Sequence, residues 1–233
     1  MTKGAERGFA LAYARAVMQS WAFGGFYSSD KELGRAPLSC PGLDLDDADR
    51  VGKRGTMCGI AGIVARRRLS SDYRNAISAI GAALAHRGPD GSGEIAGDHF
   101  ALSMRRLSII DVAGGAQPLY NEDRSLVLVC NGEIYNHVEL RSALEQRGHR
   151  FATHSDAETI LHLYEEQGDR CVHSLRGMFA FALWDHKKRR LTLARDRLGE
   201  KPLYVVETPN GVVFSSELKS LLAERFKLAV HNE

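Results

Sequence analysis

Several predicted strands of this 233-residue chain are apolar on both faces, which limits the folds open to it. A strand with one face in water alternates apolar and polar residues, whereas residues 59–65 (Gly-Ile-Ala-Gly-Ile-Val-Ala) do not alternate. Strands of this kind must be covered on both sides, either by two packed sheets or by helices on both faces of one sheet. Further strands are expected at residues 100–110, 126–130, 179–184, 190–195, 203–207 and 212–215.

Helices are predicted between some of these strands. Residues 73–85 carry apolar side chains at helical spacing, and two later segments at 138–147 and 157–167 each run up to a glycine that would end a helix. The Pro-Asn-Gly sequence at 209–211 would join the last two strands into a hairpin. The pattern therefore mixes helices with strands, and both ways of covering the strands stay open at this point.

The composition is that of an ordinary globular protein, with 44% hydrophobic and 26% charged residues. The 31 basic and 29 acidic residues leave a formal charge of +2, which gives no electrostatic case for a nucleic-acid or membrane partner. No run of apolar residues is long enough to span a bilayer. The four cysteines lack paired C-x-x-C spacing, so we expect neither disulfides nor a zinc site and favour a reducing, cytoplasmic location.

Residues 1–56 differ from the rest of the chain. They end in a Pro/Gly/Asp-rich stretch without periodicity, and the apolar run near their start is interrupted by Arg15 and Gln19, which argues against a secretory signal. We interpret this segment as a leader or upstream extension, poorly ordered and outside the core. The folded domain is predicted to occupy residues 57–233.

Cys58, directly after Met57, is the candidate nucleophile. If Met57 were an initiator and were removed, one residue would carry both a thiol and a free α-amino group. An amine with an ordinary pKa of about 7.7 to 8.0 can accept a proton near neutral pH, and the thiolate is a strong nucleophile. The alternative is that Cys58 is simply a small apolar residue at the start of a buried strand.

A series of short motifs resembles the glutaminase domain of glutamine-hydrolysing asparagine synthetases. Each motif alone is weak, but together they cover about residues 57 to 225 in the expected order. They are Met-Cys-Gly-Ile-Ala-Gly from 57, His-Arg-Gly-Pro-Asp from 86, Arg-Leu-Ser-Ile-Ile-Asp from 106 with Gly-Ala-Gln-Pro-Leu-Tyr-Asn from 115, Asn-Gly-Glu-Ile-Tyr-Asn from 131, Ser-Asp-Ala-Glu from 155, Gly-Met-Phe-Ala-Phe-Ala from 177 and Arg-Asp-Arg-Leu-Gly-Glu-Lys-Pro-Leu-Tyr from 195.

The resemblance implies a fold, an activity and catalytic residues. The fold would be an α+β, four-layer αββα sandwich of the N-terminal-nucleophile hydrolase type. The enzyme would be a class II glutamine amidotransferase that hydrolyses L-glutamine to glutamate and ammonia. Cys58 would form a thioester with its own α-amino group as base, so activity would require initiation at Met57 or cleavage before Cys58. Asn131 and the backbone amide of Gly132 would form the oxyanion hole.

The resemblance also implies substrate-binding residues. Arg106 would bind the α-carboxylate of glutamine through its planar guanidinium, and the backbone near Ile109 would complete that part of the pocket. Glu133 and Asp156 would hold the α-ammonium.

Each role has a structural alternative. Arg106 follows Arg105, and either could be a surface charge. Asn131-Gly132 taken alone is typical of a hairpin turn. Asp156 could cap the helix that follows it, a role compatible with binding ligand.

No metal or cofactor site is predicted in this chain. His86, His137, His154 and His162 show no metal-binding spacing and are interpreted as structural or exposed. ATP and Mg²⁺ would be needed only by a synthetase domain, whose Ser-Gly-Gly-x-Asp pyrophosphate loop is absent from the chain, so a separate synthetase domain or chain is a possible partner. The motif containing Asp196, Arg197 and Lys201 would brace a turn that faces such a partner.

Two other functions compete with this one. The chain could be a catalytically silent truncated fragment or interaction module with a blocked nucleophile. It could also be a glutaminase of the glucosamine-phosphate or phosphoribosylamine branch, although the stretch from residue 106 to 121 fits that branch less well.

Overall fold

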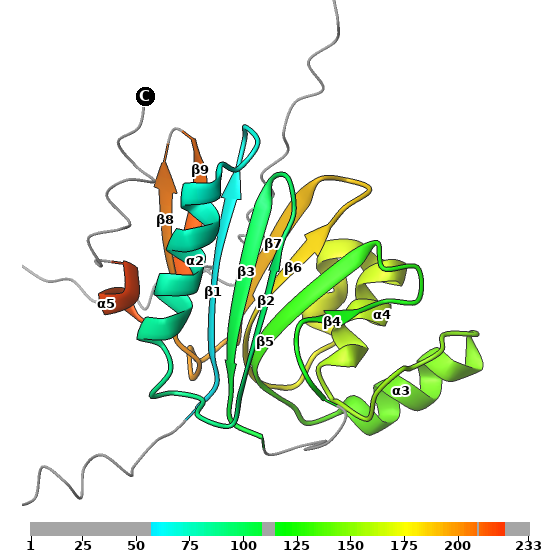
Figure 1. The fold of residues 1–233 in the computed structure, drawn as a ribbon. Helices are drawn as coiled ribbons and strands as arrows, with labels where there is room; N and C mark the ends of the chain where they lie inside the picture. Colours follow the sequence, from blue (N-terminus) through cyan, green and yellow to red (C-terminus); the bar gives the residue numbers. More distant parts are fainter. Residues whose placement is uncertain (1–56, 109–114, 209, 222–233) are drawn as a thin grey trace, which may run out of the picture.

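The computed structural model describes residues 57–108, 115–208 and 210–221, and it contains two antiparallel sheets that pack against each other (Figure 1). The first sheet has the strand order β2-β3-β1-β9-β8 and the second the order β4-β5-β6-β7. The strands are β1 (Gly59–Ala65), β2 (Gly91–Ala96), β3 (Phe100–Arg106), β4 (Leu119–Tyr120), β5 (Leu126–Ile134), β6 (Gly177–Asp185), β7 (Arg190–Arg195), β8 (Tyr204–Thr208) and β9 (Gly211–Ser215).

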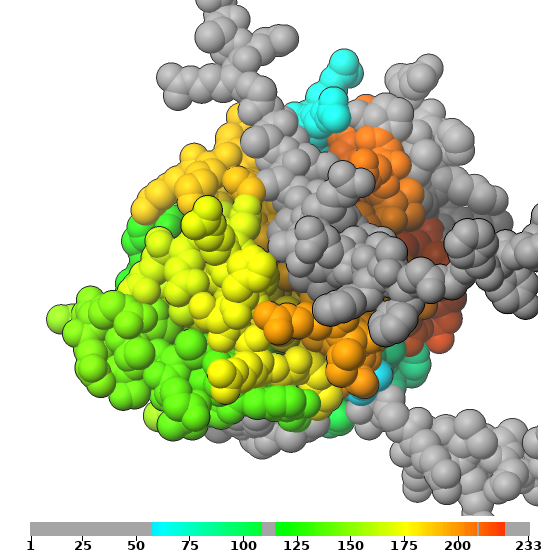
Figure 2. Space-filling model, turned by 180° about the vertical axis from the view of Figure 1, so that it is seen from behind, coloured from blue at the N-terminus to red at the C-terminus, as the bar shows by residue number. Residues whose placement is uncertain are grey.

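Helices cover the outer faces of both sheets. Helix α2 lies on the first sheet, while α3 and α4 lie on the side of the second (Figure 1). Seen from behind, α3 and α4 form much of the molecular surface (Figure 2). The predicted four-layer αββα arrangement is therefore confirmed. The helices are α2 (Ser71–Ala83), α3 (His137–Gln146), α4 (Glu158–Gln167) and α5 (Leu218–Leu221), with a 3-10 helix at Gly168–His173.

Some strands are apolar on both faces because each face packs into a different hydrophobic core. In β6, Ala180 and Ala182 belong to the core between the two sheets, whereas Phe181 between them belongs to the core under α4. All seven residues of β1 are likewise buried, because α2 covers one face of this strand and the second sheet covers the other. Successive side chains of a strand point to opposite faces, so a doubly covered strand has no polar side.

Strand β5 is longer than its apolar run predicts, and this extension shapes the site. The predicted strand stops at residue 130, but β5 continues through Asn131 and Gly132, which pair with Ala180 and Phe179 of β6. The hairpin-turn alternative for this dipeptide is therefore wrong. Glycine is required because a Cβ at position 132 would lie 2.1 Å from the carbonyl oxygen of Met178.

Two strands were not predicted, and one predicted strand is shorter. Strand β2 is only partly buried and contains two glycines, one of which, Gly93, lies so close to the Gln117 carbonyl that a Cβ would overlap it. Strand β4 has two residues and exists only by pairing with β5. Strand β3 ends at residue 106, and the last two residues of its predicted range, 109–110, lie outside the described residues.

The predicted helices and final hairpin agree with the structure within a few residues. Helix α2 begins two residues before its predicted range, and α3 and α4 each begin or end one residue from theirs. Strands β8 and β9 pair as an antiparallel hairpin. Within the described ranges, no helix is both long and apolar enough to cross a membrane.

Candidate active site

A cavity of about 100 Å³ lies where the start of β1, the end of β3 and the far end of β5 meet. Its lining brings together predicted site residues that are up to 98 positions apart in the sequence, because the start of β1, the end of β3, the end of β5 and the segment before α4 all meet there. The predicted residue Ile109 lies outside the described residues. The predicted residues that line the cavity are Cys58, Arg106, Asn131, Gly132, Glu133 and Asp156.

Cys58 is held at the beginning of β1 by contacts on both its side chain and its backbone. The Leu107 N–H donates to the Cys58 sulfur at 3.3 Å, and the same sulfur lies 3.5 Å from the Leu107 carbonyl oxygen. The carbonyl of Cys58 accepts a hydrogen bond from Arg87 Nε at 3.0 Å, and Arg87 is paired in turn with Glu217 at 3.0 Å. Cys58 is therefore positioned by the His-Arg-Gly-Pro-Asp segment as well as by its own strand.

The thiol is poorly ionised where it stands. Burial raises the pKa of the Cys58 thiol above its ordinary value, and the Leu107 N–H and the positive charges of Arg106 and Lys201 offset only part of that rise. At neutral pH the group is therefore a thiol, and it needs a base before it can attack a carbonyl.

Asn131 supplies a hydrogen-bond donor to the cavity. Its side chain is 1% exposed, and its Nδ2 atom has no hydrogen-bond partner among the described residues. A buried donor left unsatisfied costs roughly 1 to 3 kcal/mol, so it is usually paired or functional. Because Asn131 is fixed within the β5–β6 ladder, this donor needs little reorganisation to bind an oxygen that develops charge.

Asp156 is fixed against the end of β5. Its Oδ2 atom accepts a hydrogen bond from the Ile134 N–H at 2.6 Å. Within the described part of the chain, α4 has no side-chain cap, so the alternative role of Asp156 as a helix cap is wrong. The contact with Ile134 holds the Asp156 carboxylate in the cavity lining, to which Glu133 also belongs.

The adjacent arginines at the end of β3 have different roles. Arg105 donates through Nε to the Gly81 carbonyl of α2 at 2.9 Å, on the outer face of the sheet. Arg106 lines the cavity, as strand alternation requires. Arg106 is therefore the arginine of the pair that can reach a substrate carboxylate.

Lys201 was assigned only to a turn, but its side chain belongs to the cavity. Its N–H does donate to Asp196 in the predicted turn, at 3.0 Å, and Asp196 also accepts from the backbone of Leu198 and Glu200. The Lys201 side chain is nearly buried, lines the cavity and donates through Nζ to the sulfur of Met57 at 3.2 Å. The feature of the sequence that could have indicated this role is a lysine within a motif whose other residues form a turn.

Gln117 is a second lining residue that was not singled out from the sequence. Its side-chain amide donates to the Cys130 carbonyl at 3.0 Å and accepts from the Cys130 N–H at 2.6 Å. These two bonds fix the backbone of β5 immediately before Asn131. The backbone contacts of Leu107 with Cys58 were also missed, because main-chain groups leave no mark in the sequence.

The layered fold, with a cysteine directly before a central strand, is that of the N-terminal-nucleophile class. The chain belongs to the glutamine amidotransferase domain family, which matches residues 57–233. This membership confirms the resemblance found in the motifs.

Curated relatives are glutamine-hydrolysing asparagine synthetases. Asparagine synthetase 2 of Bacillus subtilis is 43% identical over 169 residues, which is 72% of this chain and 22% of the relative. Asparagine synthetase B of Escherichia coli is 44% identical over 167 residues, 71% of this chain and 30% of the relative. The chain thus spans less than a third of the length of these relatives.

Solved structures with the same fold are more distant. The glutamine phosphoribosylpyrophosphate amidotransferase of B. subtilis superposes with a TM-score of 0.56 at 22% identity, covering 70% of this chain and 43% of that one. A structure described as the allosteric regulatory enzyme of purine biosynthesis gives a TM-score of 0.58 at 23% identity, with the same coverage. At this identity the likeness shows the fold alone.

Proposed function

We propose that this domain hydrolyses L-glutamine to L-glutamate and ammonia through a thioester on Cys58. The observation that carries the proposal is the single cavity in which the Cys58 thiol, the Asn131 amide donor and the Arg106 guanidinium meet. Membership in the glutamine amidotransferase family supports the same activity. A catalytically silent fragment is not favoured, because the cavity retains the predicted nucleophile, donor and charged groups.

The chemistry begins with a proton transfer. A free α-amino group on Cys58 takes the thiol proton, and the thiolate attacks the amide carbon of glutamine. Asn131 Nδ2 and the Gly132 N–H stabilise the oxyanion that forms. The carbon–nitrogen bond then breaks, and the proton held by the amine passes to the leaving nitrogen, which departs as ammonia.

Hydrolysis of the thioester completes the cycle. The same amine takes a proton from water as the water oxygen attacks the thioester carbon. The carbon–sulfur bond breaks, glutamate leaves, and the sulfur recovers its proton from the ammonium group. The oxyanion donors act in both halves of the reaction.

The remaining charged groups of the cavity select the amino-acid end of the substrate. Arg106 binds the α-carboxylate of glutamine, a role that suits a planar guanidinium. Glu133 and Asp156 hold the α-ammonium, and Asp156 keeps one oxygen for this after accepting the bond from Ile134. The predicted contribution of the backbone at Ile109 remains part of this proposal.

The ammonia is proposed to pass to a synthetase domain or chain, as the names of the relatives suggest. ATP and Mg²⁺ would be needed only there, as the resemblance of the motifs implies. An adjoining groove of about 480 Å³ shares Met178 with the active-site cavity. It is also lined by Tyr135 and Leu198, large apolar side chains that are 62% and 86% exposed. We propose that the synthetase partner covers this groove, which would bury both side chains and shield the ammonia from water.

Cys58→Ala tests the nucleophile. The form that begins at Cys58 should release glutamate from glutamine, and the Ala variant should show no turnover, because no other group could form the thioester. Cys171→Ala is the matched control, since that thiol is also buried but lies in the core under α4. Hydrolysis that survives Cys58→Ala would exclude the mechanism.

The state of the Cys58 nitrogen gives a second test. A peptide nitrogen has no basic lone pair, so the chain that starts at Met1 should be slower than the Cys58-start form by about 10² to 10⁴, the usual contribution of a general base. Intact mass and glutaminase rate are measured on the same samples. Equal rates for the two forms, with Met1 retained, would show that Cys58 uses another base.

A further inference from the structure

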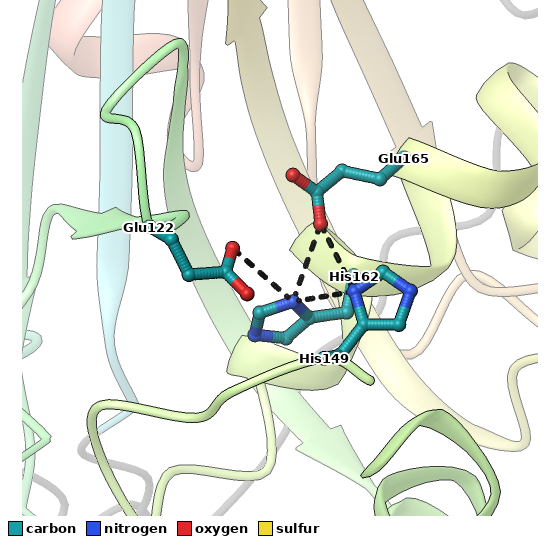
Figure 3. A group of neighbouring side chains, drawn as sticks. All are labelled: Glu122, His149, His162 and Glu165. Atoms are coloured by element: carbon teal, nitrogen blue, oxygen red, sulfur yellow. Dashed lines mark hydrogen bonds and ion pairs between the residues drawn. The ribbon is translucent and has the colours of Figure 1, made fainter. Parts of the chain in front are cut away.

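Two histidines and two glutamates converge outside the active-site cavity (Figure 3). Glu122 follows β4, His149 lies between α3 and α4, and His162 and Glu165 are one turn apart on α4. One nitrogen or oxygen atom of each residue lies within 4.8 Å of the corresponding atoms of the other three. His162 is fully buried, so the group is anchored in the core under α4.

The distances within this group match one face of a metal coordination tetrahedron. His149 Nδ1 lies 3.2 Å from His162 Nδ1, and these two nitrogens lie 3.2 Å and 3.3 Å from Glu165 Oε2. Metal–ligand bonds of about 2.0 to 2.2 Å in a tetrahedral site put neighbouring ligand atoms roughly 3.3 to 3.6 Å apart. Glu122 Oε2, at 3.8 Å from His162 Nδ1, is placed to supply the fourth ligand.

Hydrogen bonds alone account poorly for the triangle formed by the two Nδ1 atoms and Glu165 Oε2. Each imidazole Nδ1 is either a donor or an acceptor, and the Glu165 oxygen is an acceptor, so hydrogen bonds can satisfy at most two of the three contacts. When both Nδ1 atoms donate to Glu165 Oε2, their two N–H groups are left facing each other at 3.2 Å, whereas a cation centred behind the triangle is bound by all three atoms through their lone pairs. The arrangement therefore favours a cation over a hydrogen-bonded network.

The outward-facing nitrogens of both histidines are turned toward further carboxylates. His149 Nε2 lies 3.2 Å from Glu166 Oε1, and His162 Nε2 lies 3.6 Å from Glu158 Oε1. A carboxylate behind the imidazole is the usual second layer of a metal site, because it fixes the ring and makes the ligating nitrogen more basic. Both rings thus present Nδ1 to the centre of the group (Figure 3).

The two glutamates are also held from outside. Glu165 Oε1 accepts from Asn121 Nδ2 at 2.7 Å, which leaves Oε2 facing the histidines. Glu122 Oε1 accepts from the Arg150 N–H at 3.1 Å, which leaves its Oε2 facing the centre. Glu122, His149 and Glu165 therefore each have one polar atom held by a neighbour and one directed inward, whereas His162 Nε2 is buried without a hydrogen-bond partner among the described residues.

We propose that Glu122, His149, His162 and Glu165 bind one divalent transition-metal ion, with Zn²⁺ the best fit. Two imidazole nitrogens and two carboxylate oxygens form a donor set that suits Zn²⁺ and its neighbours in the first transition row. This goes beyond the expectation that the chain holds no metal, which rested on histidine spacing. The signal in the sequence was the His-x-x-Glu spacing at 162–165, which places both residues on one face of a helix.

The ion would act as a structural clamp. It would join α4 to the segment before it and to the connection between β4 and β5. Glu158, behind His162, also accepts from the backbone N–H groups of Ala152 and Thr153, and this loop leads directly to Asp156 in the substrate cavity. Metal binding should therefore stabilise the fold and steady the substrate pocket from outside, without entering the chemistry at Cys58.

The test is a Zn²⁺ titration of the full chain, free of any affinity tag and stripped of metal with a chelator. Calorimetry on the parent and on Cys58→Ser separates this site from zinc held by the active-site thiol. We expect one Zn²⁺ per chain in both, a higher melting temperature with Zn²⁺, and a tetrahedral visible spectrum when Co²⁺ replaces it. Absence of stoichiometric binding would overturn the proposal.

Substitutions locate the ion. His149→Ala and Glu165→Gln should each weaken Zn²⁺ binding at least about 10- to 100-fold, the range seen even for second-layer changes. His173→Ala and Glu145→Gln, which lie outside the group, should leave binding unchanged. Glu122→Gln, at an exposed position, serves if the other variants fail to fold. Affinity that is equal in all variants would mean an adventitious ion only and would sink the proposal.

Discussion

The cavity at Cys58 and the Glu122–His149–His162–Glu165 group are two polar sites in one small domain, and they differ in how their atoms are satisfied. The cavity contains the buried Asn131 amide nitrogen, which is unpaired among the described residues, and a thiol whose burial raises its pKa. In the second group, the outer polar atoms of Glu122, His149 and Glu165 are held by neighbours, and of this group only the outer nitrogen of His162 is buried without a partner among the described residues. The cavity therefore keeps polar atoms available to bind a substrate, whereas most polar atoms of the second group are already bonded to other parts of the protein.

Loss of the Asn131 donor should have the largest effect, and that effect should be on catalysis. Asn131→Ala should lower kcat for glutamine by roughly 10²- to 10³-fold, as removal of one oxyanion donor does in other enzymes. The KM should change little, because the donor acts mainly on the charged intermediate. Steady-state kinetics of the Cys58-start form measure both constants. A fall confined to KM would assign Asn131 to substrate binding.

The second prediction concerns the ion pair between Arg87 and Glu217, which supports the cavity because Arg87 also donates to the Cys58 carbonyl. Burial alone would raise the Glu217 pKa, but hydrogen bonds from Arg87, His86 and Lys219 lower it from 4.5 to about 2. A lowered carboxyl pKa stabilises the fold above pH 4.5, and that stabilisation is lost as pH falls toward 2. Glu217→Gln should therefore lower the free energy of unfolding at pH 7 by at most about 3 kcal/mol.

Urea unfolding at pH 7 and at pH 3 measures this difference. The gap between the parent and Glu217→Gln should narrow at pH 3, where the parent has begun to lose the contribution of the charged carboxylate. Glu145→Gln, an exposed change on α3, should leave stability nearly unaltered at both values. A gap that is constant with pH would mean that packing, rather than charge, explains the effect.

The smallest predicted effect tests the electrostatics of the nucleophile. Lys201 and Arg106 lower the thiol pKa against the larger effect of burial, so Lys201→Met should raise that pKa further. The alkaline limb of the kcat/KM profile, which reports ionisation of this thiol, should then move modestly to higher pH. Lys187→Met, at an exposed lysine paired with Asp123, should leave the profile in place. A shift to lower pH would contradict the assignment.

Patterns within single segments predicted most of the fold. The doubly apolar strands implied covered sheets, and α2 and the second sheet cover β1 on its two faces. Strands β2 and β4 could not be predicted in this way, because one is glycine-rich and partly exposed and the other is two residues long. Their existence depends on the strands beside them. The extension of β5 past Cys130 likewise depends on pairing with β6.

The parts of the site that consist of side chains in sequence motifs could be predicted. The parts that consist of backbone groups could not. The cysteine, arginine and acidic residues were identified through the family resemblance, and they line one cavity. The contacts of Leu107 with Cys58 involve only main-chain groups on the Leu107 side, which any residue except proline could provide. The group around His162 draws on three separate segments, so its composition becomes visible only in three dimensions.

The Gln117 side chain bears on how the domain avoids strand pairing with other molecules. Among the described residues, strand β4 pairs with β5 only at residues 127 and 128. Beyond that point β5 is therefore a sheet edge in this part of the chain, where N–H and C=O groups could recruit a strand from another molecule. The register would place the backbone of Gln117 opposite Cys130, but its side-chain amide makes both hydrogen bonds there instead. One side chain thus takes the place of a missing strand residue and closes the edge beside Asn131 against intermolecular β-pairing.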